Sequence, residues 1–125
     1  MKTRFQIHTA NLATDDFLIG WQGNANDYFY IGDGLADNNL HIISNNNGVP
    51  GDDDTGVAFA SDTIYTIELR MEGTAIAAIL NGVTVPLVNC NVRDLNIFHP
   101  IYYYKSNAAN NYMDVDYIRL YQERG

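Results

Sequence analysis

Hydrophobic and polar residues alternate along much of this chain, most clearly between residues 64 and 72. A two-residue period is typical of a strand with one buried face, and here that face carries Tyr65, Ile67, Leu69 and Met71. Turn signals at Glu72-Gly73-Thr74 and at Asn81-Gly82 then separate two further runs. The pattern predicts a three-stranded antiparallel meander over residues 64–88. Its middle strand is apolar on both faces, so we expect both faces to be covered.

The same period predicts strands on either side of the meander. They are expected at Arg4–His8, Asp16–Gln22, Tyr28–Ile31, Asn39–Ser44, Gly56–Ala60, Asn96–Tyr104 and Tyr112–Tyr121. Residues 45–55 are too polar for a half-buried strand and are expected to form a surface loop, in which the run Asp52-Asp53-Asp54 is solvated. Helical periodicity is absent. About nine short strands at even spacing predict an all-β fold, an antiparallel two-sheet β-sandwich formed by residues 1–125 as a single domain, with Ile67, Leu69 and Val115 in its core.

Composition and charge narrow the possible partners. The chain has 125 residues, 46% of them hydrophobic, and a formal net charge of −8. An acidic surface repels nucleic acid phosphates, which argues against nucleic-acid binding. No apolar run approaches membrane-spanning length, so membrane insertion is not expected. Cys90 is the only cysteine, so an internal disulfide is excluded and the redox compartment stays open.

Four segments resemble the concanavalin A-like lectin/glucanase superfamily: Phe17–Gly20, Tyr65–Leu69, Leu80–Gly82 and the closing strand Met113–Tyr121. The closing strand is most similar to that of laminarinase-type glycoside hydrolases. The resemblance implies a jelly roll of two curved antiparallel sheets, one of them concave and often carbohydrate-binding. The matching segments begin after the first strand of that family, which lies beside the C-terminal strand. Either the first family strand is missing and another chain supplies it, or Arg4–His8 takes the vacant place and closes the sheet.

Catalysis is not expected. Retaining glycoside hydrolysis needs two carboxyl groups about 5 Å apart, and the resembling hydrolases carry them in a Glu-x-Asp-x-x-Glu strand that does not occur here. Asp114 and Asp116 share a strand face, but a solvated strand end or a structural cation site explains them better. The three histidines show no metal-ligand spacing.

Aromatic and amide side chains point instead to carbohydrate binding. The apolar faces of sugar rings lie on aromatic rings, while their hydroxyls need Asn, Asp and Gln partners. The candidate ligand-binding residues are Trp21, Gln22, Asn24, Asp27, Tyr28, Tyr30, Tyr102 and Tyr104. The alternative is that these rings fill the core, since Tyr and Trp are ordinary strand residues. Alternation places Tyr103 opposite to Tyr102 and Tyr104, so at least one ring of the triplet should face outward.

The resemblance also implies a metal. In the resembling hydrolases the aspartate of the closing strand helps to bind a structural calcium, which corresponds to Asp116 here. The acidic stretch of residues 45–54 lacks the EF-hand pattern. Calcium at Asp116 is therefore the one cofactor that we expect.

Three functions remain open at this point. The first is a non-catalytic carbohydrate-binding module, acting outside the cell. The second is a structural or adhesive component of a virion or particle surface, such as a decoration or fibre domain, completed by protein neighbours or by copies of itself. The third is a hydrolase remnant. The oligomeric state separates the first two, because a soluble monomer favours the module and a trimer or particle-bound chain favours the structural role.

Overall fold

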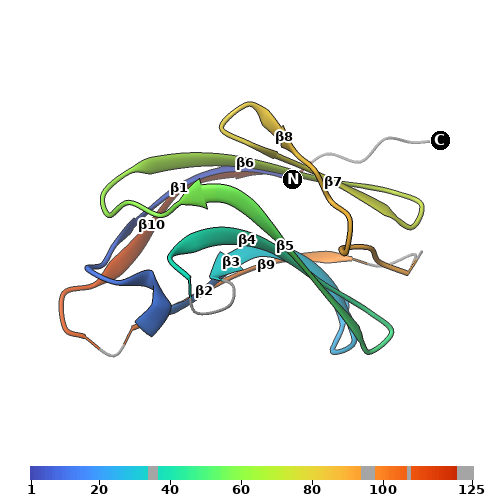
Figure 1. The fold of residues 1–125 in the computed structure, drawn as a ribbon, viewed down its shortest axis with the longest axis horizontal. Helices are drawn as coiled ribbons and strands as arrows, with labels where there is room; N and C mark the ends of the chain where they lie inside the picture. The colour runs from blue at the N-terminus through green and yellow to red at the C-terminus, as the bar shows by residue number, and fades with distance from the viewer. Residues whose placement is uncertain (34–36, 94–97, 107, 121–125) are drawn as a thin grey trace.

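The computed structural model describes residues 1–33, 37–93, 98–106 and 108–120, which form two antiparallel β-sheets that face each other (Figure 1). The strands are β1 (Lys2–His8), β2 (Asp16–Asn24), β3 (Asp27–Asp33), β4 (Asn39–Asn46), β5 (Val49–Ala58), β6 (Ile64–Glu72), β7 (Ala75–Leu80), β8 (Val83–Val85), β9 (His99–Lys105) and β10 (Tyr112–Arg119). The described residues also contain one turn of 3₁₀-helix, η1 (Leu12–Thr14). None of the helical structure described is long and apolar enough to cross a membrane.

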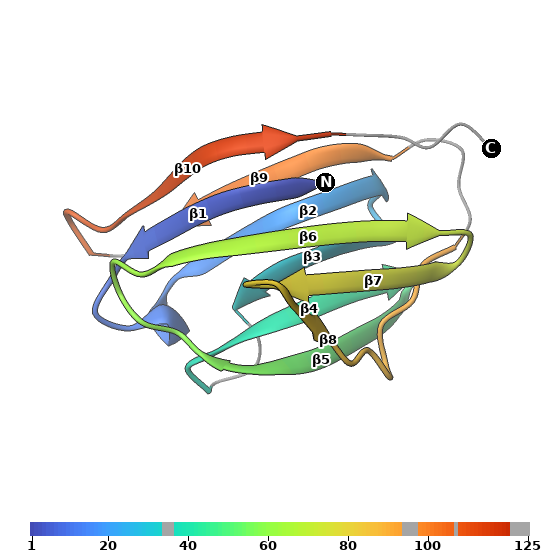
Figure 2. The same ribbon diagram turned by 90° about the horizontal axis from the view of Figure 1, so that it is seen from above.

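Within the described residues each sheet has five strands, in the order β10-β1-β6-β7-β8 in the first sheet and β5-β4-β3-β2-β9 in the second. Seen from above, the two sheets overlap with their strands roughly aligned (Figure 2). The all-β two-sheet sandwich is therefore confirmed, and so is the meander, which is formed by β6, β7 and β8. Of the expected strand at Asn96–Tyr104, residues 96 and 97 lie outside the described residues, as does residue 121 of the expected closing strand.

The core lies between the sheets and is built from alternate strand positions. Its largest fully buried side chains are Phe5, Ile7, Leu12, Phe17, Ile19, Phe29, Ile31, Leu40, Ile42, Ile67, Leu69 and Val92. Ile67 and Leu69 are buried as expected. Val115 is only half-buried, because it lies on β10 at the edge of the first sheet.

The place beside the closing strand is occupied by β1. This strand pairs with β10 on one side and with β6 on the other, and a register shift between Arg4 and Phe5 marks a bulge against β10. The second alternative from the sequence is therefore the one observed. β10 is the edge strand of its sheet in the described part of the chain.

The expectation of a surface loop over residues 45–55 is wrong. These residues continue β4, turn at Asn47-Gly48 and form most of the ten-residue strand β5. Asn47 and Gly48 both take positive φ angles, 52° and 88°, as a tight two-residue hairpin turn requires. The run of aspartates is not simply solvated either, since Asp53 is buried and Asp52 is half-buried.

The expectation that β7 is covered on both faces is also wrong. Ala75 is exposed, and Ala77 and Ile79 are only half-buried, although the strand lies between β6 and β8. Small alanine side chains leave little apolar surface to cover on this face, so the strand tolerates solvent there.

A connecting segment, residues 86–93, leaves β8 and crosses from the first sheet to the second (Figure 1). The carboxylate of Asp53 holds it by accepting hydrogen bonds from the backbone amides of Val88, Asn89 and Cys90, at 3.0–3.2 Å for the first two and 2.8 Å for the third. Burial disfavours the charged form of Asp53, but these amides outweigh it and lower the pKa of the carboxyl group. Asp53 thus fixes the segment against β5.

Candidate functional site

Both sheets bend in the same direction, so that the outer face of the second sheet is concave (Figure 1). The strand register places three rows of side chains on this concave face. They come from Leu18, Gly20 and Gln22 on β2, Tyr28, Tyr30 and Gly32 on β3, His41, Ile43 and Asn45 on β4, Pro50, Asp52 and Asp54 on β5, and His99, Ile101 and Tyr103 on β9. The middle row runs across the sheet from Ile101 through Gly20, Tyr30 and Ile43 to Asp52.

Two tyrosines form an aromatic platform on this face. The rings of Tyr28 and Tyr30 stack with centroids 5.6 Å apart and an interplanar angle of 22°. Gly32 makes room for Tyr30, because a Cβ atom added to Gly32 would lie 2.8 Å from Cε2 of that ring. The ring of Tyr30 therefore packs over Gly32, two residues further along its own strand.

Burial raises the pKa of Tyr30 to about 12, and the nearby Tyr28 and the carboxylates of Asp33 and Asp52 add to the increase. The hydroxyl group is therefore neutral at physiological pH. It can both donate and accept a hydrogen bond, as a sugar hydroxyl requires.

A buried histidine lies next to this platform, since His41 is directly opposite Gly32 in the register of β3 and β4. Its Nδ1 atom lies 2.6 Å from Oδ1 of Asp52, and its Nε2 atom lies 2.9 Å from Oδ1 of Asp37. Only 5% of the side chain is exposed. Burial alone would lower the pKa of His41, but its hydrogen bonds to Asp52 and Asp37 raise it above the usual value.

Of the candidate ligand-binding residues, the structure places Gln22, Tyr28 and Tyr30 together on the concave face. Trp21, Tyr102 and Tyr104 lie on the opposite face of the second sheet, on the side of the core. Trp21 and Tyr104 are half-buried against the core, and the Tyr104 hydroxyl donates to Oδ2 of Asp15 at 2.8 Å. Tyr102 is 65% exposed because β9 is an edge strand.

Asn24 and Asp27 stabilise the turn between β2 and β3. The Asn24 amide donates to Oδ2 of Asp27 at 2.8 Å, and the guanidinium group of Arg93 donates to the same oxygen at 2.7 Å. Burial opposes ionisation of Asp27, but these bonds and the amide of Asn47 lower the pKa of the carboxyl group. Both side chains therefore serve the turn in this structure.

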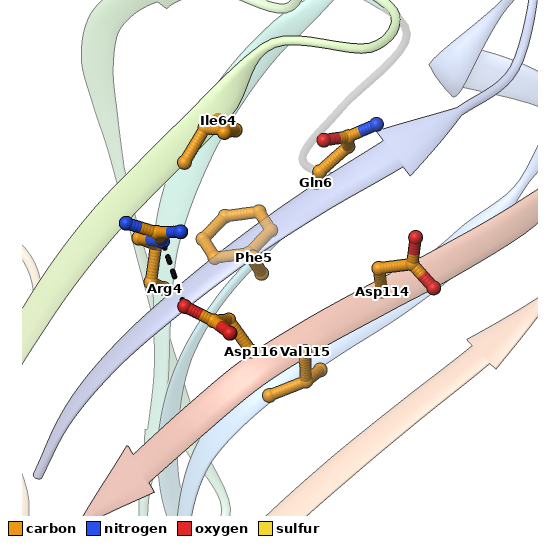
Figure 3. A pocket seen from close by; sticks show the side chains of 7 residues that line it. All are labelled: Arg4, Phe5, Gln6, Ile64, Asp114, Val115 and Asp116. Atoms are coloured by element: carbon orange, nitrogen blue, oxygen red, sulfur yellow. Dashed lines mark ion pairs between the residues drawn. The ribbon is translucent and has the colours of Figure 1, made fainter.

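Asp116, the expected calcium ligand, lies on the other sheet. It lines an open depression of about 390 Å³ with Gln6, Ile64 and Asp114, and Phe5 and Val115 lie among the same lining residues (Figure 3). Arg4 and Asp116 point toward one another (Figure 3), and Nε of Arg4 lies 2.9 Å from Oδ2 of Asp116. Calcium at Asp116 stays a prediction. Within the described residues, the side chains close enough to share a metal ion are Asp37, His41 and Asp54.

Sequence reasoning missed the contributions of β4 and β5 to the concave face. Alternation within Asn39–Ser44 assigns His41 to the face opposite Leu40 and Ile42, and this signal was available. The hairpin between β4 and β5 was not predicted. Because residues 45–55 were expected to form a loop, Asp52 and Asp54 were not expected to lie on the sheet.

A comparison with solved structures finds the same fold in the carbohydrate binding module CBM66 from Bacillus subtilis. The TM-score is 0.61 and the sequence identity 10%, over 91% of this chain and 68% of that chain. No protein-family model matches the sequence, and no curated protein matches it. The likeness supports a β-sandwich of the kind found in that module, and membership of the concanavalin A-like superfamily stays a prediction.

Proposed function

We propose that this protein is a non-catalytic carbohydrate-binding module, and that the glycan binds on the concave face of the second sheet. The observation that carries the proposal is the stacked pair Tyr28 and Tyr30, which lies along the sheet beside polar side chains. Sugar rings present axial C–H groups to such rings and hydroxyl groups to their rims. The fold shared with a module whose name states carbohydrate binding also supports this function.

The polar groups around the platform suit sugar hydroxyls. Gln22 and Asn45 lie directly opposite Tyr28 on the two neighbouring strands, and Asp52 lies beyond Ile43 in the row of Tyr30. Gln22 and Asn45 carry amide groups, whose nitrogen donates and whose oxygen accepts hydrogen bonds, and Asp52 has a second carboxylate oxygen, Oδ2, besides the one that contacts His41. A platform flanked by such groups recognises a neutral sugar better than an apolar ligand.

The acids of the concave face contact other side chains of the protein. On the concave face, Asp52 and Asp37 are hydrogen-bonded to His41, and Asp54 accepts from the side-chain amide of Asn39 at 3.0 Å. Two further acids, Glu68 and Glu72, lie four residues apart on β6, in the other sheet. Arg70 lies between the two glutamates and contacts Oε1 of Glu68 at 2.8 Å.

The alternative of a virion or particle-surface component has no observation in its favour. An extracellular location and a protein partner stay predictions.

A glycan array followed by affinity electrophoresis in the polysaccharides that it identifies tests the proposal. Tyr30→Ala and Tyr28→Ala should each weaken retention by about tenfold, which corresponds to about 1.4 kcal/mol. Tyr112→Ala is the control, because Tyr112 is also a stacked tyrosine but lies on β10 against His8, where it is exposed. Equal loss in all three variants, or retention unaffected by the first two, would contradict the assignment to the concave face.

Catalysis is tested on the same proteins. Laminarin, lichenan and agar-type polymers should release no reducing ends after prolonged incubation. Reproducible release that is abolished by Glu68→Gln or by Asp52→Asn would show that the protein is an enzyme.

A further inference from the structure

Three side chains, two from neighbouring strands and one from the segment before β4, converge at one end of the concave face. Asp37 precedes β4, His41 lies on β4, and Asp54 lies directly opposite His41 on β5. One potential ligand atom from each residue lies within 4.8 Å of the others. A metal ion that bridges such a group would sit between a ring nitrogen and two carboxylate oxygens.

The histidine is held in the orientation that a metal ligand needs. Metal-binding histidines usually bond their second ring nitrogen to a carboxylate, which fixes the ring and its tautomer. Asp52 occupies this position on Nδ1 of His41, at 2.6 Å. With the side chain 5% exposed and Nδ1 engaged, Nε2 is directed toward Asp37, whose Oδ1 lies 2.9 Å away.

The two carboxylates are also held in place. The backbone amide of Asn39 donates to Oδ1 of Asp37 at 3.0 Å. The backbone amide of Gly56 donates to Oδ1 of Asp54 at 2.7 Å, and the side-chain amide of Asn39 donates to Oδ2 at 3.0 Å. Ligands whose orientation is fixed before binding lose less conformational entropy when a metal arrives.

The donor set indicates which ion would bind. Calcium takes six to eight oxygen ligands, whereas an imidazole nitrogen with carboxylate oxygens suits Zn²⁺ and its first-row neighbours. Asp37 and Asp54 are exposed, so the remaining coordination positions face solvent.

We propose that Asp37, His41 and Asp54 form a divalent transition-metal site that prefers Zn²⁺ to Ca²⁺, with Asp52 as the residue that positions His41. On binding, the ion takes the place of the proton on Nε2, and this proton leaves to solvent. The proposal is independent of the glycan proposal and of calcium at Asp116, which lies on the other sheet.

Isothermal titration of the chelator-treated protein with ZnCl₂ tests the site without any sugar. We expect one Zn²⁺ per chain, bound more tightly than Ca²⁺ or Mg²⁺, and a rise in Tm with Zn²⁺. Asp37→Asn and Asp54→Asn change exposed residues, so the fold should survive, and each should weaken Zn²⁺ binding by at least about tenfold. Asp52→Asn should weaken it by about 10–100-fold through the orientation of His41.

His8→Gln is the matched control. His8 and Asp62 form another histidine–aspartate contact, 2.8 Å long, at an exposed site. Its loss should leave the affinity unchanged, and the Co²⁺-substituted protein should show an absorption band that disappears only in the variants of the proposed site. Absence of Zn²⁺ binding at millimolar concentration, tighter binding of Ca²⁺, or loss through His8→Gln in place of Asp54→Asn would overturn the proposal.

Discussion

Replacing Asp53 by alanine should destabilise the protein by about 2–5 kcal/mol. Asp53 is 5% exposed, and its carboxylate accepts hydrogen bonds from three consecutive backbone amides of the connecting segment. The bond to the amide of Cys90 is fully buried, and losing it leaves a donor unsatisfied at a cost of about 1–3 kcal/mol. The amides of Val88 and Asn89 are partly buried and regain water in part, so they add about 0.5–1 kcal/mol each.

Urea denaturation, followed by the fluorescence of the single tryptophan Trp21, measures this loss. Asp16→Ala is the control, because Asp16 is an exposed aspartate on β2. A difference between the two variants below about 0.5 kcal/mol would refute the role given to the amides.

The effect should also depend on pH. The folded-state pKa of Asp53 is lowered, so its contribution is complete above the unfolded pKa of about 3.9 and is lost as the pH falls through the lower folded value. The stability difference between wild type and Asp53→Ala should therefore shrink below pH of about 4. A difference that stays constant down to the acid limit of folding would show that packing, and not the charged hydrogen bonds, causes the loss.

Two further substitutions test the core and the platform. Leu69→Ala removes a side chain that is 0% exposed between the sheets and should cost about 2–5 kcal/mol in urea denaturation, and an unchanged midpoint would place Leu69 outside the core. Gly32→Ala should displace the ring of Tyr30 and strain the pairing of β2 with β3, because the new Cβ would lie 2.8–3.0 Å from Cε2 and Cδ2 of the ring and 2.8 Å from the carbonyl oxygen of Phe17. Glycan retention should then fall as it does in Tyr30→Ala, and full retention would mean that the position of the ring is not critical.

The alternation of side chains was sufficient to predict the two-sheet sandwich, since one buried face is the property that the strand period reports. It failed at residues 45–55 because the partners that make β5 acceptable are distant in sequence. Asp53 is satisfied by amides more than thirty residues away, and Asp52 by His41 on the neighbouring strand. Read alone, a run of aspartates between glycines is a loop, and only the hairpin register makes it a strand.

The same limit divides the candidate site. Alternation already separates Trp21 from Gln22, so the two could not share a surface, and Trp21 follows Phe17 and Ile19 toward the core. Strand pairing decides which tyrosines face outward, the pair Tyr28 and Tyr30 or the pair Tyr102 and Tyr104. β9 pairs with β2 so that Tyr102 lies opposite Ile19, and this pairing turns the tyrosine toward the inner side. Composition gave the right kind of side chain, and tertiary pairing decided the face.

The glycines of the second sheet connect the shape of the concave face with its chemistry. Gly20 lies opposite Tyr30, and a Cβ there would come within 2.2 Å of the carbonyl oxygen of Phe29, so β2 and β3 could not approach as they do. Gly32 gives the ring of Tyr30 a place beside its own strand, next to His41. The space that a side chain at Gly32 would need is thus taken by the ring of Tyr30. His41 lies opposite Gly32, two residues along β3 from Tyr30, so adding Zn²⁺ to the glycan-binding assay would measure whether the two proposed sites are coupled.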